Sequence, residues 1–352
     1  MDSDASTRHV RRKRYKGTHP RRFSEKYKEL NPEKFAADIE KVVARGQTPA
    51  GMHRPICVNE IMNILQPKPG ETALDATLGF GGHTRELLDH LLPGGHLFAV
   101  DVDTVELPKT EKRLRELGFG PDVLTIRKLN FAGIAQLLPE TSGGFDCILA
   151  DLGVSSMQLD DPQRGFSYKL DGPLDLRLNP QRGKPASELL RSIDTKALAD
   201  LLSKNADEPH ARIIAEAVCT SAEPLTTTKA LAERVGQALE AAHISVGEEI
   251  RNSQQRTFMA LRITVNDEFG VLDRFLELLP WCMKTGGRAA ILSFHSGEDR
   301  RVKKAFQKGV RSGIYSEAAP TPARASSAER RSNPRSSCAK LRWAVRSDTP
   351  MQ

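Results

Sequence analysis

A glycine-rich loop between two carboxylates is the part of this sequence whose residue types and spacing best suit chemistry. Asp75 closes a short apolar run, and Gly79, Gly81 and Gly82 follow before a helical pattern begins. Roughly twenty residues past Gly79, a second apolar run ends on Asp101. This order is typical of a nucleotide-binding unit, in which glycine lets the backbone approach the ligand closely. A carboxylate ending the second strand can accept both hydroxyls of a ribose, so the sequence predicts a nucleotide site.

The loop alone leaves open which nucleotide it binds. A dinucleotide site needs a third glycine for close packing of the helix on the strand, and Thr84 stands at that position. Asp75, before the first glycine, is not part of the dinucleotide pattern. An acidic residue followed by a glycine loop resembles instead the first motif of S-adenosylmethionine-dependent methyltransferases. A dinucleotide site and a structural turn without a ligand remain alternatives at this point.

Size and composition narrow the class of protein. The chain has 352 residues, which allows one large or two modest domains. No stretch approaches the roughly eighteen consecutive apolar residues of a membrane span, and the N-terminus lacks the apolar segment of a signal peptide. The five cysteines are far apart and include no C-x-x-C pair. We therefore expect a cytoplasmic protein without a metal cluster, a disulfide framework or a membrane anchor.

The net charge of +7 is concentrated at the two ends of the chain. Residues 1–30 hold ten Lys or Arg against four Asp or Glu, and residues 288–352 hold fourteen against five. Basic arms suit a polyanion, because Lys and Arg displace condensed counterions from phosphates. Tyr15 and Phe23, among the N-terminal basic residues, could stack on bases. We expect residues 1–50 to be a basic, partly disordered extension that contacts nucleic acid; a solvated tail is the alternative.

From about residue 53 the sequence alternates between apolar strands and helices. This alternation predicts a parallel sheet with helices on both faces and ligands at the carboxyl ends of the strands. Asp75, Asp101 and Asp151 all fall at such ends. The expected strands are residues 72–78, 97–102, 123–129 and 147–152, and the expected helices are residues 60–65, 85–92, 106–117 and 131–138.

The alternation stops after the fourth strand. Helical patterns without a convincing strand then predict a helical insertion in the sheet domain. These helices are expected at residues 186–193, 195–202, 212–218 and 229–242. Further along, the sequence shows one long amphipathic stretch at residues 258–283, a strand at 288–294, a loose segment at 309–334 and a last strand at 340–346.

The loop after the fourth strand carries the most specific motifs. Residues 151–160 read D-L-G-V-S-S-M-Q-L-D, residues 164–167 read R-G-F-S, and residues 171–177 read D-G-P-L-D-L-R. These runs resemble the RsmH (MraW) family, the 16S ribosomal RNA cytosine-N4 methyltransferases. The resemblance extends from about residue 52 to 346. Further matching runs lie at residues 53–56, 75–83, 257–268, 293–300, 333–336 and 339–342.

The sequence departs from the family pattern at four places. The family usually reads D-R-D-P where residues 101–104 read D-V-D-T, and Y-G-E-E where residues 205–208 read N-A-D-E. Gly297 stands in place of a leucine and Met157 in place of a common proline. None of these departures touches the glycine loop or Asp101, so they bear on substrate contacts more than on the cofactor.

The resemblance implies a fold, a reaction and a cofactor. The fold is a Rossmann-like class I methyltransferase domain, with a parallel-dominated sheet and helices on both faces, over residues 51–155 and 257–352. A mainly helical substrate-binding domain is inserted at residues 156–256. The reaction is N4-methylation of a cytidine, cytosine 1402 in the family's nomenclature, in 16S rRNA of the small ribosomal subunit. The cofactor is S-adenosyl-L-methionine, and no metal is expected.

The resemblance also assigns cofactor contacts residue by residue. Gly81, Gly82 and His83 line the methionine end, and Asp101 holds the ribose. Phe131 packs near the adenine, while Asp151 and Gln158 close the site. Asp75 and Gly79 complete the expected cofactor-binding set as parts of the glycine loop.

The reacting amine needs alignment with the methyl group and a partner for its developing charge. We expect Asp151 and His53 to be catalytic, since Asp151 occupies the place of the Asp/Asn-Pro-Pro-aromatic loop of many amino methyltransferases, although the prolines are absent. A further set of polar residues could read the cytosine edge or its phosphate, or could instead fasten the insertion to the sheet domain. This set is Ser155, Ser156, Arg164, Asp175, Arg177 and His295.

Three other functions remain open from the sequence. One is a methyltransferase for another RNA or for protein, and another is a catalytically idle ribosome-assembly factor that keeps the fold. The intact glycines and the carboxylates at Asp101 and Asp151 argue against an idle factor. A dehydrogenase is the weakest alternative because of Thr84 and Asp75.

Overall fold

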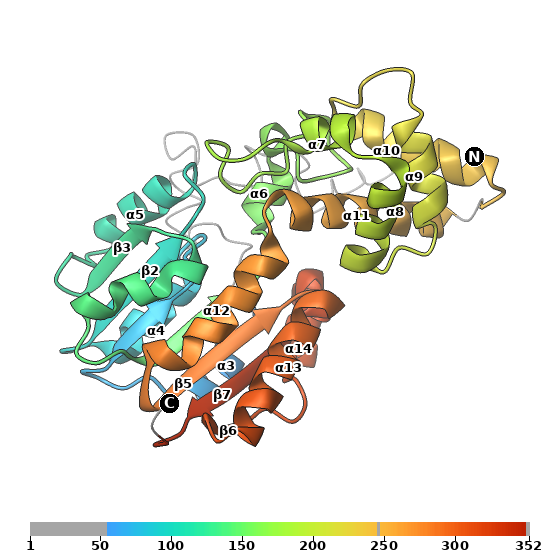
Figure 1. The fold of residues 1–352 in the computed structure, drawn as a ribbon. Helices are drawn as coiled ribbons and strands as arrows, with labels where there is room; N and C mark the ends of the chain where they lie inside the picture. Colours follow the sequence, from blue (N-terminus) through green and yellow to red (C-terminus); the bar gives the residue numbers. More distant parts are fainter. Residues whose placement is uncertain (1–54, 245–246, 350–352) are drawn as a thin grey trace, which may run out of the picture. The chain divides into compact units, whose positions relative to one another are not determined.

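The computed structural model describes residues 55–244 and 247–349, which fall in one compact unit. A seven-stranded sheet organises it, with the strand order β3-β2-β1-β4-β5-β7-β6 (Figure 1). The strands are β1 (Thr72–Asp75), β2 (His96–Asp101), β3 (Leu124–Lys128), β4 (Phe145–Asp151), β5 (Met283–Ser293), β6 (Tyr315–Ala318) and β7 (Lys340–Arg346). The basic extension expected at residues 1–50 and His53 lie outside the described residues.

The sheet is parallel from β3 to β5, and β7 is antiparallel to both β5 and β6. In register, Asp75 lies beside Ala99 on β2 and Leu149 on β4. Because parallel strands end at the same edge, Asp75, Asp101 and Asp151 come together there. This confirms the Rossmann-like α/β fold and the parallel-dominated sheet that the sequence predicted.

Helices cover both faces of the sheet. Successive residues of a strand point to opposite faces, so they pack in two separate hydrophobic cores. Leu74 packs in one core with η2 (Phe131–Glu140), α12 (Glu268–Cys282) and α13 (Ser296–Arg311). Its neighbour Ala73 packs in the other core. The helices on that second face are α3 (Val58–Leu65), α4 (Gly82–Leu91) and α5 (Leu107–Glu116).

Between β4 and α12 the chain forms helices around a third core, and the helical patterns of the sequence predicted such helices; the bounds of an inserted domain stay a prediction. This core contains Leu202, Ile214, Leu231, Leu239 and Leu261, all essentially inaccessible to solvent. The segment begins with the short helices α6 (Ser156–Asp160) and η3 (Pro162–Arg164). Its longer helices are α7 (Ala186–Ser192), α8 (Thr195–Ala206), α9 (Ala211–Cys219), α10 (Thr228–Ala241) and α11 (Gly247–Val265).

The C-terminal third contains a helix break and an ordered segment. The amphipathic stretch 258–283 is divided between two helices, because α11 ends at Val265 and Asp267 takes a left-handed conformation with a φ of 49°. Asn266 holds this break, since its side chain accepts from the backbone of Leu178 and donates to the carbonyl of Leu176.

The segment 309–334, expected to be loose, contains β6 and α14 (Ser327–Ser332), followed by η4 (Pro334–Cys338). Strand β6 has four residues and pairs only with β7, so its stability depends on a partner distant in sequence. Within the described residues, no helix is both long and apolar enough to cross a membrane.

Candidate active site

The glycine loop after β1 is organised by Asp75, which is 1% exposed. One carboxylate oxygen accepts from the backbone N–H of Thr77 at 3.0 Å, and the other accepts from the Thr84 hydroxyl at 2.7 Å. Gly79 and Gly81 have φ angles of 49° and 79°, a region that favours glycine. Asp75 therefore holds the loop through hydrogen bonds to Thr77 and Thr84. Thr84 stands where a dinucleotide site would have glycine.

Asp101 ends β2 and faces the glycine loop. One of its oxygens accepts from the backbone N–H of Gly79 at 2.8 Å, and the other accepts from the N–H of Asp103 at 2.9 Å. Burial raises the pKa of this carboxyl group to about 6, with the neighbouring carboxylates of Asp103 and Asp75 adding to the effect. Each oxygen retains a second lone pair, so the carboxylate can still accept from a pair of vicinal hydroxyls.

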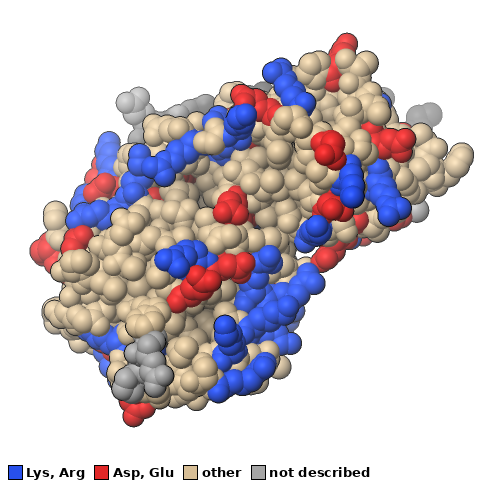
Figure 2. All heavy atoms as spheres, viewed as in Figure 1, with Lys and Arg blue, Asp and Glu red and all other residues tan. Residues whose placement is uncertain are grey.

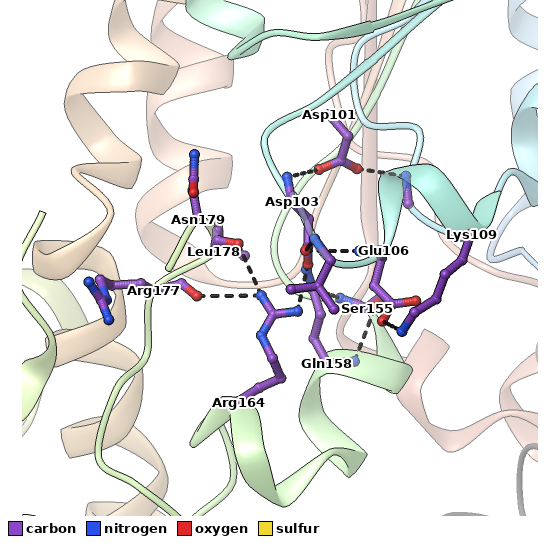
Figure 3. Close-up of polar contacts among 12 residues, drawn as sticks. Asp101, Asp103, Glu106, Lys109, Ser155, Gln158, Arg164, Arg177, Leu178 and Asn179 are labelled. Atoms are coloured by element: carbon purple, nitrogen blue, oxygen red, sulfur yellow. Dashed lines mark hydrogen bonds and ion pairs between the residues drawn. The ribbon is translucent and has the colours of Figure 1, made fainter. Parts of the chain in front are cut away.

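Asp103 is a buried hub that the sequence reasoning did not single out. Its Oδ1 accepts from the N–H groups of Val105 and Glu106 at the start of α5. Its Oδ2 accepts from Gln158 Nε2 at 2.6 Å and from Arg164 at 2.9 Å. Figure 3 shows the side chains converging on Asp103 from the segment after β4. The D-x-D spacing after β2 was the available signal for it.

Ser155, Gln158 and Arg164 connect the segment after β4 to this hub. Ser155 and Gln158 form a reciprocal cap on α6: each side chain accepts from the other residue's backbone N–H. Arg164 also donates to the carbonyl oxygens of Arg177 and Leu178, as Figure 3 shows. The Asp103–Arg164 pair therefore links the end of β2 to the insertion.

A small cavity lies between the glycine loop and the capped segment. Its volume of about 10 Å³ provides room for roughly one water molecule. A nucleoside cannot occupy it unless the segment carrying Gln158 moves. The cavity is lined by Gly79, Phe80, Asp101, Asp103, Glu106, Ser155, Met157 and Gln158.

Asp151 ends β4 beside the loop. Its backbone N–H donates to the Thr77 hydroxyl at 2.6 Å, which ties the ends of β4 and β1 together. Its Oδ1 is buried without a hydrogen-bond partner in the described chain, and its Oδ2 lies 3.5 Å from His83 Nδ1. Burial raises the pKa of Asp151 to about 6, although the nearby imidazole of His83 works in the opposite direction. This carboxylate therefore has acceptor capacity to spare.

His83 connects Asp151 to the start of the described chain. Its Nε2 lies 3.0 Å from the carbonyl oxygen of Ile56. Because a carbonyl only accepts, we infer that Nε2 carries a proton, so Nδ1 donates to Asp151 only when the ring is an imidazolium. The ring packs at the beginning of α4 and is 6% exposed.

His295 stands directly after β5, which neighbours β4. Its Nε2 lies 3.2 Å from Glu298 Oε1, and the other oxygen of Glu298 accepts from the N–H of Phe294. Burial opposes ionisation of Glu298, but His295 and the Phe294 N–H hold its pKa below the ordinary value. The Nδ1 atom of His295 is buried without a hydrogen-bond partner in the described chain.

Comparison with known proteins identifies the family to which this chain belongs. The family model described as the MraW methylase family matches residues 50–347. This chain belongs to the MraW methylase family. Ribosomal RNA small subunit methyltransferase H 1 of Lachnoclostridium phytofermentans is 53% identical over 96% of this chain and 93% of its own length. Ribosomal RNA small subunit methyltransferase H 2 of Alkaliphilus metalliredigens is 52% identical, covering 98% of this chain and all of its own length.

One solved structure resembles this MraW-family chain at a low level of similarity. A SAM-dependent O-methyltransferase from Thermotoga maritima matches with a TM-score of 0.39 and 10% identity, over 84% of this chain and 66% of its own. A match at this level of identity does not show which residues form the site.

The remaining predicted residues of this MraW-family site lie in different settings. Arg177 and Asp175 face each other, with two nitrogen–oxygen contacts of 2.7 Å, and Arg177 also donates to the carbonyl oxygen of Gly183. Phe131 is half-buried, and its ring packs edge-on against Phe275. These contacts give Asp175 and Arg177 a local structural role; their contact with a substrate stays a prediction.

Gly82 has a steric reason to be glycine. A Cβ atom at this position would lie 2.5 Å from Cγ of Pro55, which is closer than two carbon atoms can pack. Gly82 therefore allows the segment before α3 to lie against the start of α4. Its predicted contact with the cofactor is a separate matter and stays a prediction.

Proposed function

We propose that this protein is an S-adenosyl-L-methionine-dependent methyltransferase that acts in the cytoplasm on the 16S rRNA of the small ribosomal subunit. The finer proposal is N4-methylation of a cytidine, cytosine 1402 in the family's nomenclature. Family membership and the names of the relatives support the substrate class. One observation carries the chemistry: a diol acceptor, Asp101, and a carboxylate with spare acceptor capacity, Asp151, lie at neighbouring strand ends.

The polar groups and glycines present suit the proposed cofactor, provided that the segment carrying Gln158 moves to enlarge the cavity of about 10 Å³. The carboxylate of Asp101 would accept from the ribose hydroxyls, and Phe131 would pack near the adenine. The loop residues Gly79, Gly81 and Gly82, with His83, would surround the methionine end, and Asp75 would hold the loop. When bound, the sulfonium group supplies an electrophilic methyl group. Gln158 lies at the cavity between these groups and would close over the adenosine.

Asp151 is proposed as the catalytic group. Its carboxylate would accept a hydrogen bond from the exocyclic amine and so orient the nitrogen lone pair toward the methyl group. A bound S-adenosyl-L-methionine would supply the methyl group, and its sulfur would retain the electron pair of the S–C bond. The amine proton would then pass to the carboxylate. His53 remains a proposed partner for this step, outside the described residues.

Ser155, Ser156, Arg164, Asp175, Arg177 and His295 remain proposed substrate contacts. The hydrogen bonds of Arg164 and Arg177 are already used within the protein, which favours a supporting role for these two residues. His295 has a buried ring nitrogen without a hydrogen-bond partner in the described chain, so it retains a group that a substrate could bind.

The Asp101→Asn substitution should weaken S-adenosyl-L-methionine binding by roughly tenfold to a hundredfold, because it removes a charged acceptor worth about 1.5–3 kcal/mol. For wild type, the affinity should fall as the pH drops through about 6, since protonation removes an acceptor. Isothermal titration calorimetry between pH 5 and 8 measures both effects. An Asn variant with wild-type affinity and the same pH dependence would remove Asp101 from the ribose site.

The target nucleotide is tested by mapping modified positions in 16S rRNA from a strain that lacks this protein. Mass spectrometry of nuclease fragments should show one cytidine that lacks an N4-methyl group, and returning the gene should restore it. An unchanged 16S rRNA would contradict the proposed substrate. Calorimetry separates this outcome from an idle assembly factor, which need not bind the cofactor.

A further inference from the structure

Helix α13 presents a row of exposed cations beside the site. Its basic residues are Arg300, Arg301, Lys303, Lys304, Lys308 and Arg311, and all except Arg301 are exposed. Figure 2 shows Lys and Arg side chains gathered over the region that Figure 1 labels α13 and α14. The concentration of charge is therefore a property of the folded surface as well as of the sequence.

The acidic residues of α13 face away from this row. Glu298 is 3% exposed and accepts from the backbone of Phe294. Asp299 binds Lys340 at 3.0 Å and Arg342 at 2.6 Å. The charges of both acids are thus used within the protein, and the exposed face of the helix carries only positive charge.

Most exposed cations of this row have no acidic partner in the described chain, unlike two exposed cations on α5 and α12. On α5 and α12, Lys112 pairs with Glu116 and Arg274 pairs with Glu277. On α13, exposed Arg300 pairs with Asp207 across the surface. Its other exposed cations have no ion-pair or hydrogen-bond partner in the part of the chain that the structure describes. They are Lys303, Lys304, Lys308 and Arg311.

The row has a direction relative to the site. Arg300, Lys304, Lys308 and Arg311 are spaced by three or four residues, so they lie along one side of the helix over about 16 Å. The helix begins after His295, one element beyond β5, and β5 pairs with β4 beside Asp151. The row therefore starts near the strand ends that form the site and leads away from them.

We propose that the exposed face of α13 binds the phosphates of the RNA strand that flanks the target nucleotide. This inference rests on the proposed function, since it extends the path of the RNA from the site to the surface. Unpaired Lys and Arg side chains bind phosphates without reading bases. The contact therefore fixes the strand and adds affinity, while selection of the base belongs to the site.

The test compares two triple variants that lose the same charge. Lys304→Gln, Lys308→Gln and Arg311→Gln are combined in the α13 variant. Lys68→Gln, Lys112→Gln and Arg274→Gln are combined in the control, which removes exposed cations from other elements. Gln keeps the helix propensity close to that of Lys and Arg. Equal thermal melting temperatures and equal S-adenosyl-L-methionine affinities would show that both variants are folded.

Binding of a fluorescein-labelled, mixed-sequence single-stranded RNA is measured by anisotropy over a range of NaCl concentrations. The α13 variant should bind roughly a hundredfold more weakly at about 0.1 M salt, and the slope of log K against log[salt] should shrink by about 2. The control should bind close to wild type. With 16S rRNA as substrate, the α13 variant should show a raised KM and an unchanged kcat.

An unchanged slope in the α13 variant, or an equal loss in the control, would overturn the proposal. The failure of the proposed function has a different signature. If wild type binds RNA through α13 but transfers no methyl group to 16S rRNA, the result supports the phosphate-binding surface and contradicts the proposed reaction.

Discussion

Asp151→Asn should lower kcat by roughly a hundredfold, with little change in S-adenosyl-L-methionine affinity. The buried Oδ1 of Asp151 has no partner in the described chain, and its Oδ2 has only the long contact to His83. An asparagine keeps the size of the side chain but cannot take a proton from the amine. Single-turnover methylation with saturating cofactor measures the chemical step separately from binding.

The same substitution should change the pH profile. The pKa of Asp151 is raised to about 6, and the ionised form is the proton acceptor. Wild-type kcat should therefore fall about tenfold for each pH unit below 6 and level off above it. Saturating cofactor removes the similar titration of Asp101 from this profile, because Asp101 acts on cofactor affinity. The Asp151→Asn variant should lack the inflection near pH 6.

Asp146→Asn is the matched control for this prediction. Asp146 lies near the opposite end of the same strand, where it pairs with Lys284 at 2.7 Å. Its substitution should leave kcat and the pH profile close to wild type. Near-full turnover in Asp151→Asn with normal cofactor affinity would exclude Asp151 as the group that acts on the amine.

Arg164→Met should destabilise the protein by about 3–5 kcal/mol, because it leaves the carboxylate of Asp103 buried without its cation. In the Asp103–Arg164 pair the side chains are 1% and 7% exposed and lie 2.9 Å apart. The variant also loses the hydrogen bonds from Arg164 to the carbonyl oxygens of Arg177 and Leu178. Urea unfolding at neutral pH measures the change in the free energy of unfolding.

A second variant separates the ion pair from the loss of packing. The double variant Asp103→Asn with Arg164→Met should be less destabilised than the sum of its two single variants, since it buries no unpaired charge. Arg177→Met is the matched control, because the Asp175–Arg177 pair is about one-fifth exposed on each side. It should cost less than Arg164→Met, because water partly screens the Asp175–Arg177 pair. Equal costs for Arg164→Met and Arg177→Met would contradict a special role for the buried hub.

Both the sheet and its functional edge could be predicted from the sequence. Short apolar runs that alternate with helical patterns predict parallel strands, and parallel strands end at one edge. Asp75, Asp101 and Asp151 could thus be placed together from their positions at the ends of those runs. The four runs before the insertion correspond to β1–β4, and the last expected strand has the bounds of β7.

The elements that the sequence predicted poorly depend on distant partners. The break between α11 and α12 is held by Asn266, whose partners Leu176 and Leu178 lie about ninety residues earlier. Strand β6 is short and has no edge to pair with until β7 is in place. The local periodicity of the sequence predicts neither the contacts of Asn266 nor the pairing of β6 with β7.

For this protein, the sequence by itself determined the edge where Asp75, Asp101 and Asp151 meet, because strand ends and glycine turns follow from local pattern. It also supplied the family motifs. Only the tertiary structure decided which polar groups satisfy one another across that edge. In it, Asp103 binds Gln158 and Arg164, and Arg177 pairs with Asp175. Asp151 keeps an oxygen without a hydrogen-bond partner in the described chain. The contacts of Asp103 depend on burial and on segments that are far apart in the chain, and the contact between Arg177 and Asp175 depends on the local fold of a loop, neither of which residue spacing encodes.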